Sequence, residues 1–198
     1  EKVRSAKVVY DIGAAVGTYT VFASKLNEGS KIHAFEPELI NFGALNRNIY
    51  KNGVVNVTTH NIALGDEEAT LCFSDINQDL AGKGTHKLSM DSNAKGYEVQ
   101  VRIGDSYIRE NGISPPDVIK IDVEGFEGKV LNGLRETLKV FKPILLIEIH
   151  PKLLIDVGDT AESVSLFMKD LGYDEIEVRE AGLSDTAHRQ SHKMYIPR

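Results

Sequence analysis

The sequence predicts an α/β fold of the doubly wound class, in which helices cover both faces of a mostly parallel sheet. Short apolar runs alternate with longer amphipathic segments along the chain, which is the order that strand-helix-strand units require. The apolar runs are also too continuous for one face of the sheet to meet solvent. Because crossovers between parallel strands are right-handed, the intervening helices are expected on both faces.

Five apolar runs are expected to be strands, since they are short, partly β-branched and bounded by Gly, Pro, Asp or Asn. They are residues 8–12, 31–35, 56–64, 117–122 and 143–149. Between the strands, apolar side chains recur at helical spacing. The expected helices are residues 16–26, 37–51 and 124–139.

Two further regions depart from this alternation. Residues 71–75 and 97–103 are expected to be β segments on either side of a Gly-, Lys- and Ser-rich loop, residues 76–96, which is a candidate substrate lid or a surface hairpin. From about residue 160 the pattern indicates one more helix and two strand-like pieces, DEIEVRE and HKMYIPR. These pieces are expected to form an antiparallel hairpin at one edge of the sheet.

Composition narrows the class of protein. With 198 residues, 41% of them hydrophobic and 26% charged, we expect one domain over residues 1–198. We expect no membrane span, because no apolar run is long enough, and no signal peptide at the N-terminus. The single cysteine, Cys72, suits a reducing compartment, so the expected location is cytoplasmic. A net charge of −6 disfavours nucleic-acid partners.

The stretch VVYDIGAAVG, residues 8–17, ends the first strand in an acid and places two glycines four residues apart. Ligands of open α/β sheets bind outside the carboxyl ends of the strands. A dinucleotide site would have glycine at position 15 to admit a pyrophosphate, but this chain has Ala15. Asp11 would attract an ammonium group and repel a phosphate.

Glu36 follows the second strand, 23 residues after Gly13. At that distance an acid reaches both hydroxyls of a ribose. A ligand with an amino group, a ribose and no phosphate is therefore indicated, and S-adenosylmethionine (SAM) matches this description better than NAD.

In order and spacing, several segments resemble the FkbM-type SAM-dependent methyltransferases. They are YDIGAAVGTYT, IHAFEPE, NFGALNRNIYKN, NIALGD, VIKIDVEGFEGKVLNG and ILLIEIHP. The resemblance implies a Rossmann-like class I methyltransferase fold. It also implies transfer of a methyl group from SAM to a hydroxyl of a sugar, glycolipid or secondary-metabolite acceptor, so the expected partner is a small molecule or a glycan.

The resemblance also assigns cofactor-binding residues by position. The methionine end of SAM falls to Asp11, Gly13 and Gly17, the ribose to Glu36, and the adenine face to Ile62 and Ala63. Ala14 and Asp122 complete the expected cofactor-binding set. Ala15 departs from the family pattern, which usually has Asn at this position.

Acidic and imidazole side chains gather at the ends of the fourth and fifth strands. Asp122 and Glu124 follow the fourth strand, and Glu148 and His150 close the fifth, so these candidate catalytic groups are expected to face one crevice. Methylation of an alcohol requires a base, and we assign that role to His150 or Asp122, with the other acids orienting the acceptor. A Mg²⁺ ion held by Asp122 and Glu148 is a lesser alternative.

Some of these residues also fit structural roles. Glu124 and Glu127 suit the first turn of the helix that begins near residue 125. Lys120 is as well explained by an ion pair on the face of its strand as by a functional role.

At the level of the whole chain, two alternative functions remain. One is a catalytically silent SAM-binding protein, which Ala15 keeps open, and the other is a nicotinamide-dependent oxidoreductase, which Asp11 and Ala15 oppose.

Overall fold

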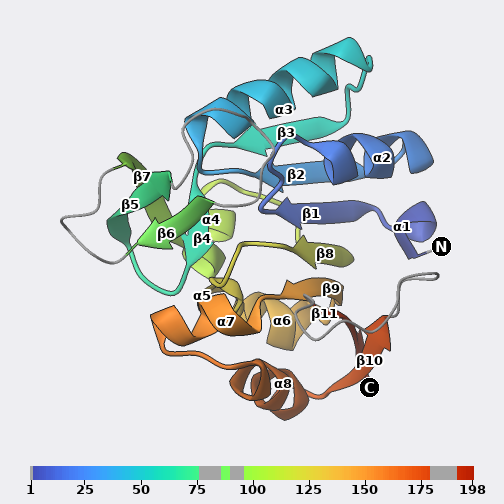
Figure 1. The fold of residues 1–198 in the computed structure, drawn as a ribbon. Coiled ribbons are helices and arrows are strands. Elements are labelled where there is room, and N and C mark those ends of the chain that lie inside the picture. The colour runs from blue at the N-terminus through green and yellow to red at the C-terminus, as the bar shows by residue number, and fades with distance from the viewer. Residues whose placement is uncertain (1, 76–85, 90–95, 179–190) are drawn as a thin grey trace, which may run out of the picture.

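A computed structural model of the chain describes residues 2–75, 86–89, 96–178 and 191–198, and its central element is a seven-stranded sheet (Figure 1). The strand order is β10-β11-β9-β8-β1-β2-β3. The bounds are β1 Val8–Ile12, β2 Lys31–Phe35, β3 Val57–His60, β8 Val118–Ile121, β9 Ile144–Ile149, β10 Tyr173–Val178 and β11 Ser191–Pro197. Strands β3, β2, β1, β8 and β9 are parallel neighbours, as predicted for a doubly wound sheet.

Helices cover both faces of this sheet. Side chains of α2 and α3 pack with Val9, Ile32 and Ala34 on one face, whereas α4, α5, α6 and α8 pack with the larger apolar cluster around Tyr10 and Ile119 on the other. The helices are α1 Lys2–Ser5, α2 Thr18–Leu26, α3 Leu39–Lys51, α4 Gly104–Glu110, α5 Glu127–Gly133, α6 Arg135–Phe141, α7 Pro151–Leu154, the 3₁₀ turn η1 Ile155–Val157 and α8 Ala161–Asp170.

Side-chain caps fix where two of the longer helices begin. The Glu38 carboxylate accepts the amide protons of Ile40 and Asn41 at the start of α3. Thr160 and Ser163 form a reciprocal capping box at the start of α8. Each cap satisfies amides that have no partner within the helix, which stabilises a helix by about 1 kcal/mol.

The expected strand 56–64 is two strands that belong to different sheets. After β3, the Asn61 side-chain amide donates to the carbonyls of Glu36 and Pro37, at 2.9 and 3.0 Å. The chain then enters β4, Ala63–Gly65, which pairs with the second sheet. The sequence pattern could not reveal this break, because its cause is a contact with a distant turn.

The expected helix 124–139 is also interrupted, between α5 and α6. Gly133 lies so close to β4 that a Cβ atom there would be 1.8 Å from the carbonyl oxygen of Gly65. The Asp105 carboxylate then caps a new helix by accepting the amide protons of Glu136 and Thr137. Tertiary contacts on both sides of Leu134 therefore divide one amphipathic segment into two short helices.

The second sheet has the order β4-β7-β5-β6, with β5 at Ala69–Asp75, β6 at His86–Ser89 and β7 at Gly96–Ile103. Figure 1 shows it standing to one side of the central sheet. The expected β segments 71–75 and 97–103 are confirmed as the antiparallel pair β5 and β7. Apart from β6 and residue 96, the candidate lid 76–96 lies outside the described residues.

The antiparallel hairpin expected at one sheet edge is confirmed. It is made by β10 and β11. The C-terminal strand β11 lies one position inside the edge, because it pairs antiparallel with β9 on its other side. In the part of the chain that the structure describes, no helix has the length and apolarity needed to cross a lipid bilayer.

Candidate active site

The turn between β1 and α2 has three residues with positive φ: Gly13 at 77°, Ala15 at 48° and Gly17 at 86°. The amides of Gly13 and Ala14 both donate to the carbonyl oxygen of Phe35, at 3.0 Å. The turn is thus fastened to the carboxyl end of β2. The structure therefore places the expected methionine-binding turn beside the expected ribose-binding strand end.

Gly13 also brings this turn against the end of β8. A Cβ atom on Gly13 would lie 1.8 Å from the carbonyl oxygen of Asp122. Only glycine permits so close an approach together with a φ of 77°. The expected cofactor turn and the expected catalytic residues after β8 are therefore in direct backbone contact.

Asp11 lies beneath the turn and is fully buried. Its Oδ2 atom accepts the hydroxyl proton of Thr20 at 2.5 Å, and its Oδ1 atom is 3.5 Å from the ammonium of Lys120. Lys120 also contacts Asp122 at 3.2 Å and donates to the carbonyl of Gly13 at 3.2 Å. In this structure the cation beside Asp11 is thus Lys120, and contact of Asp11 with the amine of SAM stays a prediction.

Glu36 is buried at the end of β2, and its two oxygens accept the amide protons of Ala15 and Glu38, at 2.8 and 2.9 Å. Burial raises the pKa of Glu36 to about 7, against these hydrogen bonds, which lower it. Each carboxylate oxygen can accept two hydrogen bonds, so both retain capacity for a ribose hydroxyl. The structure thus joins Glu36 to the first turn through Ala15.

Ile62 and Ala63 follow Asn61, whose amide holds the carbonyls of Glu36 and Pro37. Ala63 is buried and Ile62 packs against the main apolar cluster. Their expected place beside Glu36 is therefore compatible with a contact to the adenine, which stays a prediction.

His33 and His60 behave as packing residues. The His60 ring stacks on Phe35 at 4.5 Å, and its nitrogens lie 3.1 Å from His33 and 3.2 Å from the hydroxyl of Tyr107. Burial, followed by the neighbouring His33, lowers the pKa of His60 to about 4. His60 is therefore neutral near pH 7 and adds no charge to the strand ends.

His150 is the centre of the second half of the site. Its side chain is 3% exposed, and its Nδ1 atom is 2.6 Å from a carboxylate oxygen of Glu127. Its Nε2 atom faces Glu124 at 3.4 Å and Asp122 and Glu148 at 3.9 Å. Among the described residues, Nε2 has no hydrogen-bond partner. The four expected catalytic residues are thus brought together as predicted.

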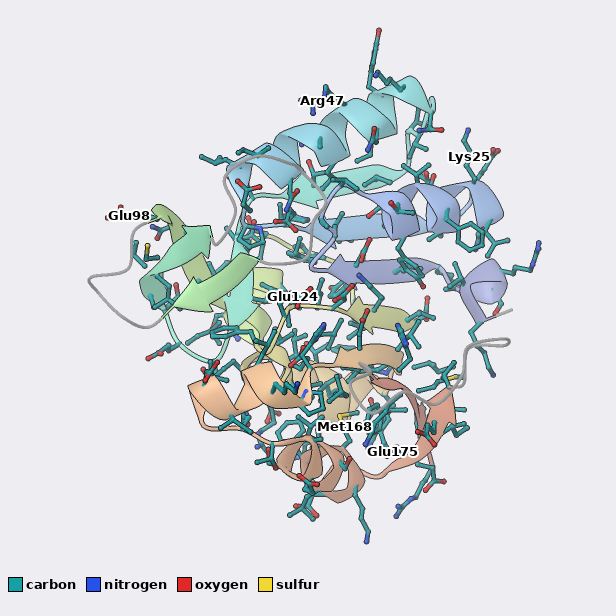
Figure 2. All side chains as sticks on the ribbon, viewed as in Figure 1. Lys25, Arg47, Glu98, Glu124, Met168 and Glu175 are labelled. Atoms are coloured by element: carbon teal, nitrogen blue, oxygen red, sulfur yellow. The ribbon has the colours of Figure 1, made fainter. Side chains whose placement is uncertain are left out.

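Backbone strain accompanies this convergence. Glu124 has a φ of 50°, and Gly125 has a φ of 96°. A Cβ atom on Gly125 would lie 2.4 Å from the Cβ of Leu153, so the loop after β8 packs directly on α7. Figure 2 labels Glu124 beside the ends of the central strands. Non-glycine residues in this region of φ cost about 1–3 kcal/mol each and concentrate at functional sites.

Two residues of the site make more contacts than the sequence predicted. Glu127 is fully buried and holds His150, rather than only charging the first turn of α5. Lys120 lies between Asp11 and Asp122 instead of forming one simple ion pair. The signal for Lys120 was its two-residue spacing from Asp122, which places both on one face of a strand. The register that sets Lys120 beside Asp11 was not readable from the sequence.

Comparison with known proteins decides the family. The methyltransferase FkbM domain family matches residues 11–175. The chain belongs to this family. The chain is also 27% identical over 150 residues to the hexuronic acid methyltransferase AglP of Haloferax volcanii, covering 76% of this chain and 59% of that protein. It is 29% identical over 164 residues to the 31-O-demethyl-FK506 methyltransferase FkbM of Streptomyces tacrolimicus, covering 68% and 62% respectively.

The fold of this FkbM domain also matches a solved family structure. The FkbM methyltransferase of Methylobacillus flagellatus superposes with a TM-score of 0.63 at 20% identity, over 98% of this chain and 44% of that one. Two other solved structures share the fold at 12% and 13% identity, with TM-scores of 0.57, and they were determined in complex with the demethylated product of SAM and with SAM. This chain spans about three fifths of the length of the two curated relatives.

The Mg²⁺ alternative fits this FkbM site poorly. Donor atoms of Asp122, Glu148 and His150 lie within 4.8 Å of one another. However, Mg²⁺ prefers oxygen ligands in octahedral geometry, and the third donor beside the two expected carboxylates is an imidazole nitrogen. The Lys120 ammonium also already neutralises Asp122 at 3.2 Å. The residues present therefore do not fit Mg²⁺.

The departure of Ala15 from the family pattern has a measurable consequence. At a φ of 48°, an alanine is strained, whereas asparagine visits this conformation routinely. We expect Ala15→Asn to increase the free energy of unfolding by about 1 kcal/mol in urea denaturation. Ala14→Asn, at a buried neighbour without positive φ, should instead destabilise the domain. Equal loss of stability in both variants would contradict this account of the turn.

Proposed function

We propose that this FkbM domain transfers a methyl group from SAM to a hydroxyl oxygen of a sugar, glycan or secondary-metabolite acceptor. The observation that carries the proposal is the buried Nε2 atom of His150, which has no hydrogen-bond partner among the described residues and faces three carboxylates. The printed names of two relatives support the acceptor class, since one acts on a hexuronic acid and the other on the 31-O position of demethyl-FK506.

In this proposal the two halves of the site have separate tasks. The first turn, with Gly13, Ala14 and Gly17, and the carboxylate of Glu36 bind the cofactor. When bound, SAM supplies the methyl group as a sulfonium and leaves as a neutral thioether. Because Gly13 touches the carbonyl of Asp122, the methyl group would be presented at the end of β8.

His150 is assigned as the base. As the acceptor oxygen bonds to the methyl carbon, its proton passes to Nε2 of His150, which yields a methyl ether and an imidazolium. Asp122, Glu124 and Glu148 surround this nitrogen and stabilise the imidazolium, and their remaining lone pairs orient hydroxyls of the acceptor. Asp122 is the second candidate for the base, but its pairing with Lys120 makes it the weaker one.

The experiment has two stages. Calorimetric titration with SAM and with NADH separates a methyltransferase from a nicotinamide-dependent oxidoreductase. Incubation of a cell extract with the domain and methyl-labelled SAM, followed by mass spectrometry, then searches for a labelled methyl ether. Binding of SAM without any labelled product would favour a catalytically silent SAM-binding protein, and binding of NADH alone would overturn the proposal.

With an acceptor identified, the role of His150 becomes testable. We expect His150→Gln to lower kcat by about 100-fold or more, because general-base catalysis contributes about 10²- to 10⁴-fold, while the Kd for SAM changes little. His33→Gln is the matched control, since His33 is a partly buried histidine that packs with His60 away from this cluster. Full turnover by His150→Gln would exclude His150 as the base.

A further inference from the structure

Glu127 and His150 form a buried carboxylate-imidazole pair. The Glu127 side chain is fully buried and that of His150 is 3% exposed, and Oε1 lies 2.6 Å from Nδ1. The two residues come from different elements, the first turn of α5 and the residue that precedes α7. Burial of both partners makes the contact far less sensitive to solvent than a surface ion pair.

The chemistry of this contact fixes the tautomer of the imidazole. An ionised carboxylate oxygen only accepts hydrogen bonds, so Nδ1 of His150 is the donor. In the neutral ring the other nitrogen, Nε2, then carries the lone pair. This is the nitrogen that faces Asp122, Glu124 and Glu148.

The backbone holds both partners in place. The Gly125 amide donates to the same oxygen, Oε1 of Glu127, at 3.0 Å. The carbonyl of His150 accepts the amide protons of Leu153 and Leu154, both at 3.0 Å, so the backbone of His150 is fixed at the start of α7. Gly125 packs against Leu153 at a distance that excludes a Cβ atom. The carboxylate and the imidazole are therefore positioned by two loops locked together.

We infer that Glu127 is a positioning residue that holds His150 in the tautomer and orientation in which Nε2 takes the proton of the acceptor hydroxyl. The inference deepens the proposed function and rests on it for the catalytic step. The geometry of the pair itself can be tested without cofactor or acceptor.

The charged groups around His150 determine in which direction its pKa is shifted. Glu127 of α5 faces Nδ1. Three other acids face Nε2: Asp122 and Glu124 lie in the loop after β8, and Glu148 lies in β9. Two further groups lie behind these acids: the His192 imidazole of β11 is 3.3 Å from Glu148, and the Lys120 ammonium of β8 is 3.2 Å from Asp122. Burial lowers the pKa of His150, but the hydrogen bond and charge of Glu127 and the neighbouring acids outweigh it and raise that pKa above 6.5.

A raised pKa means that His150 is protonated below it and becomes a competent base only as the pH rises through it. Removing the charge of Glu127 with Glu127→Gln leaves an amide that can still accept from Nδ1. We expect the pKa of His150, followed by NMR of its ¹⁵N-labelled ring, to fall by about one unit or more. The acidic limb of the pH profile of kcat should move down by the same amount, and kcat at its plateau should fall about 10- to 100-fold.

Asp105→Asn is the matched control. Asp105 also accepts amide protons at a helix start, those of Glu136 and Thr137, but it contacts none of the cluster around His150. We expect this variant to lose stability and to leave the titration of His150 unchanged. A folded Glu127→Gln protein with an unchanged pKa of His150 would overturn the inference.

If Glu127→Gln does not fold, the unmodified protein still tests whether Glu127 fixes the tautomer of His150. Above its pKa, the ¹⁵N shifts of His150 should show a protonated Nδ1 and an unprotonated Nε2, and the opposite tautomer would overturn the inference. The signals are assigned by their loss in His150→Gln. Because these spectra need neither SAM nor acceptor, failure of the pair is distinguishable from failure to find methyl transfer.

Discussion

Gly13→Ala is expected to lower the free energy of unfolding by about 2 to 5 kcal/mol and to abolish measurable SAM binding. The new Cβ atom would lie 1.8 Å from the carbonyl oxygen of Asp122, an overlap that only a backbone shift relieves. Overpacking costs about 1–3 kcal/mol, and a left-handed conformation of a non-glycine residue costs about 1–2 kcal/mol more. The shift would separate the cofactor turn from the end of β8, which calorimetric titration with SAM detects.

Gly53→Ala is a control that separates the cost of steric overlap from the cost of a left-handed backbone conformation. Gly53 has a similar φ of 59°, but a Cβ atom there would meet no described atom within 4 Å. We expect this variant to lose only about 1 kcal/mol in denaturant unfolding and to bind SAM normally. If both variants lost the same stability, close packing between the two turns would not be the reason for glycine at position 13.

Lys120→Met should destabilise the domain by about 3 to 5 kcal/mol, because it leaves the fully buried carboxylate of Asp11 without its cation. Methionine keeps most of the volume and the apolar stem of lysine, so the loss reports charge and hydrogen bonding rather than a cavity. Chemical denaturation measures it. The change also removes the contacts of the ammonium with Asp122 and with the carbonyl of Gly13.

A double-mutant cycle and a control test this explanation. Asp11→Asn combined with Lys120→Met should cost less than the sum of the two single changes, because the uncompensated charge is gone. Lys129→Met removes a more exposed ion pair, in which the ammonium lies 3.3 Å from Asp66, and should cost less than about 1 kcal/mol. Strict additivity in the cycle would show that Asp11 and Lys120 do not stabilise each other.

Most of the fold could be predicted from the spacing of apolar residues along the chain. Strands β1, β2, β8 and β9 and helices α2, α3 and α8 lie close to the expected segments, because a buried parallel strand and an amphipathic helix each impose a local pattern. Two of the expected elements, residues 56–64 and 124–139, are instead broken by contacts between residues far apart in sequence. Asn61 holds the end of β2, and Gly133 packs on Gly65.

The sequence by itself determined the fold class, the family and the set of strand-end residues at the candidate site. These depend on local order along the chain: an acid after a strand, a glycine at a turn, a motif at its spacing. Only the tertiary structure decided which of these side chains contact one another. It paired Asp11 with Lys120 and Glu127 with His150, because strand register and the docking of α7 on the β8 loop set those distances, and neither leaves a pattern in the sequence.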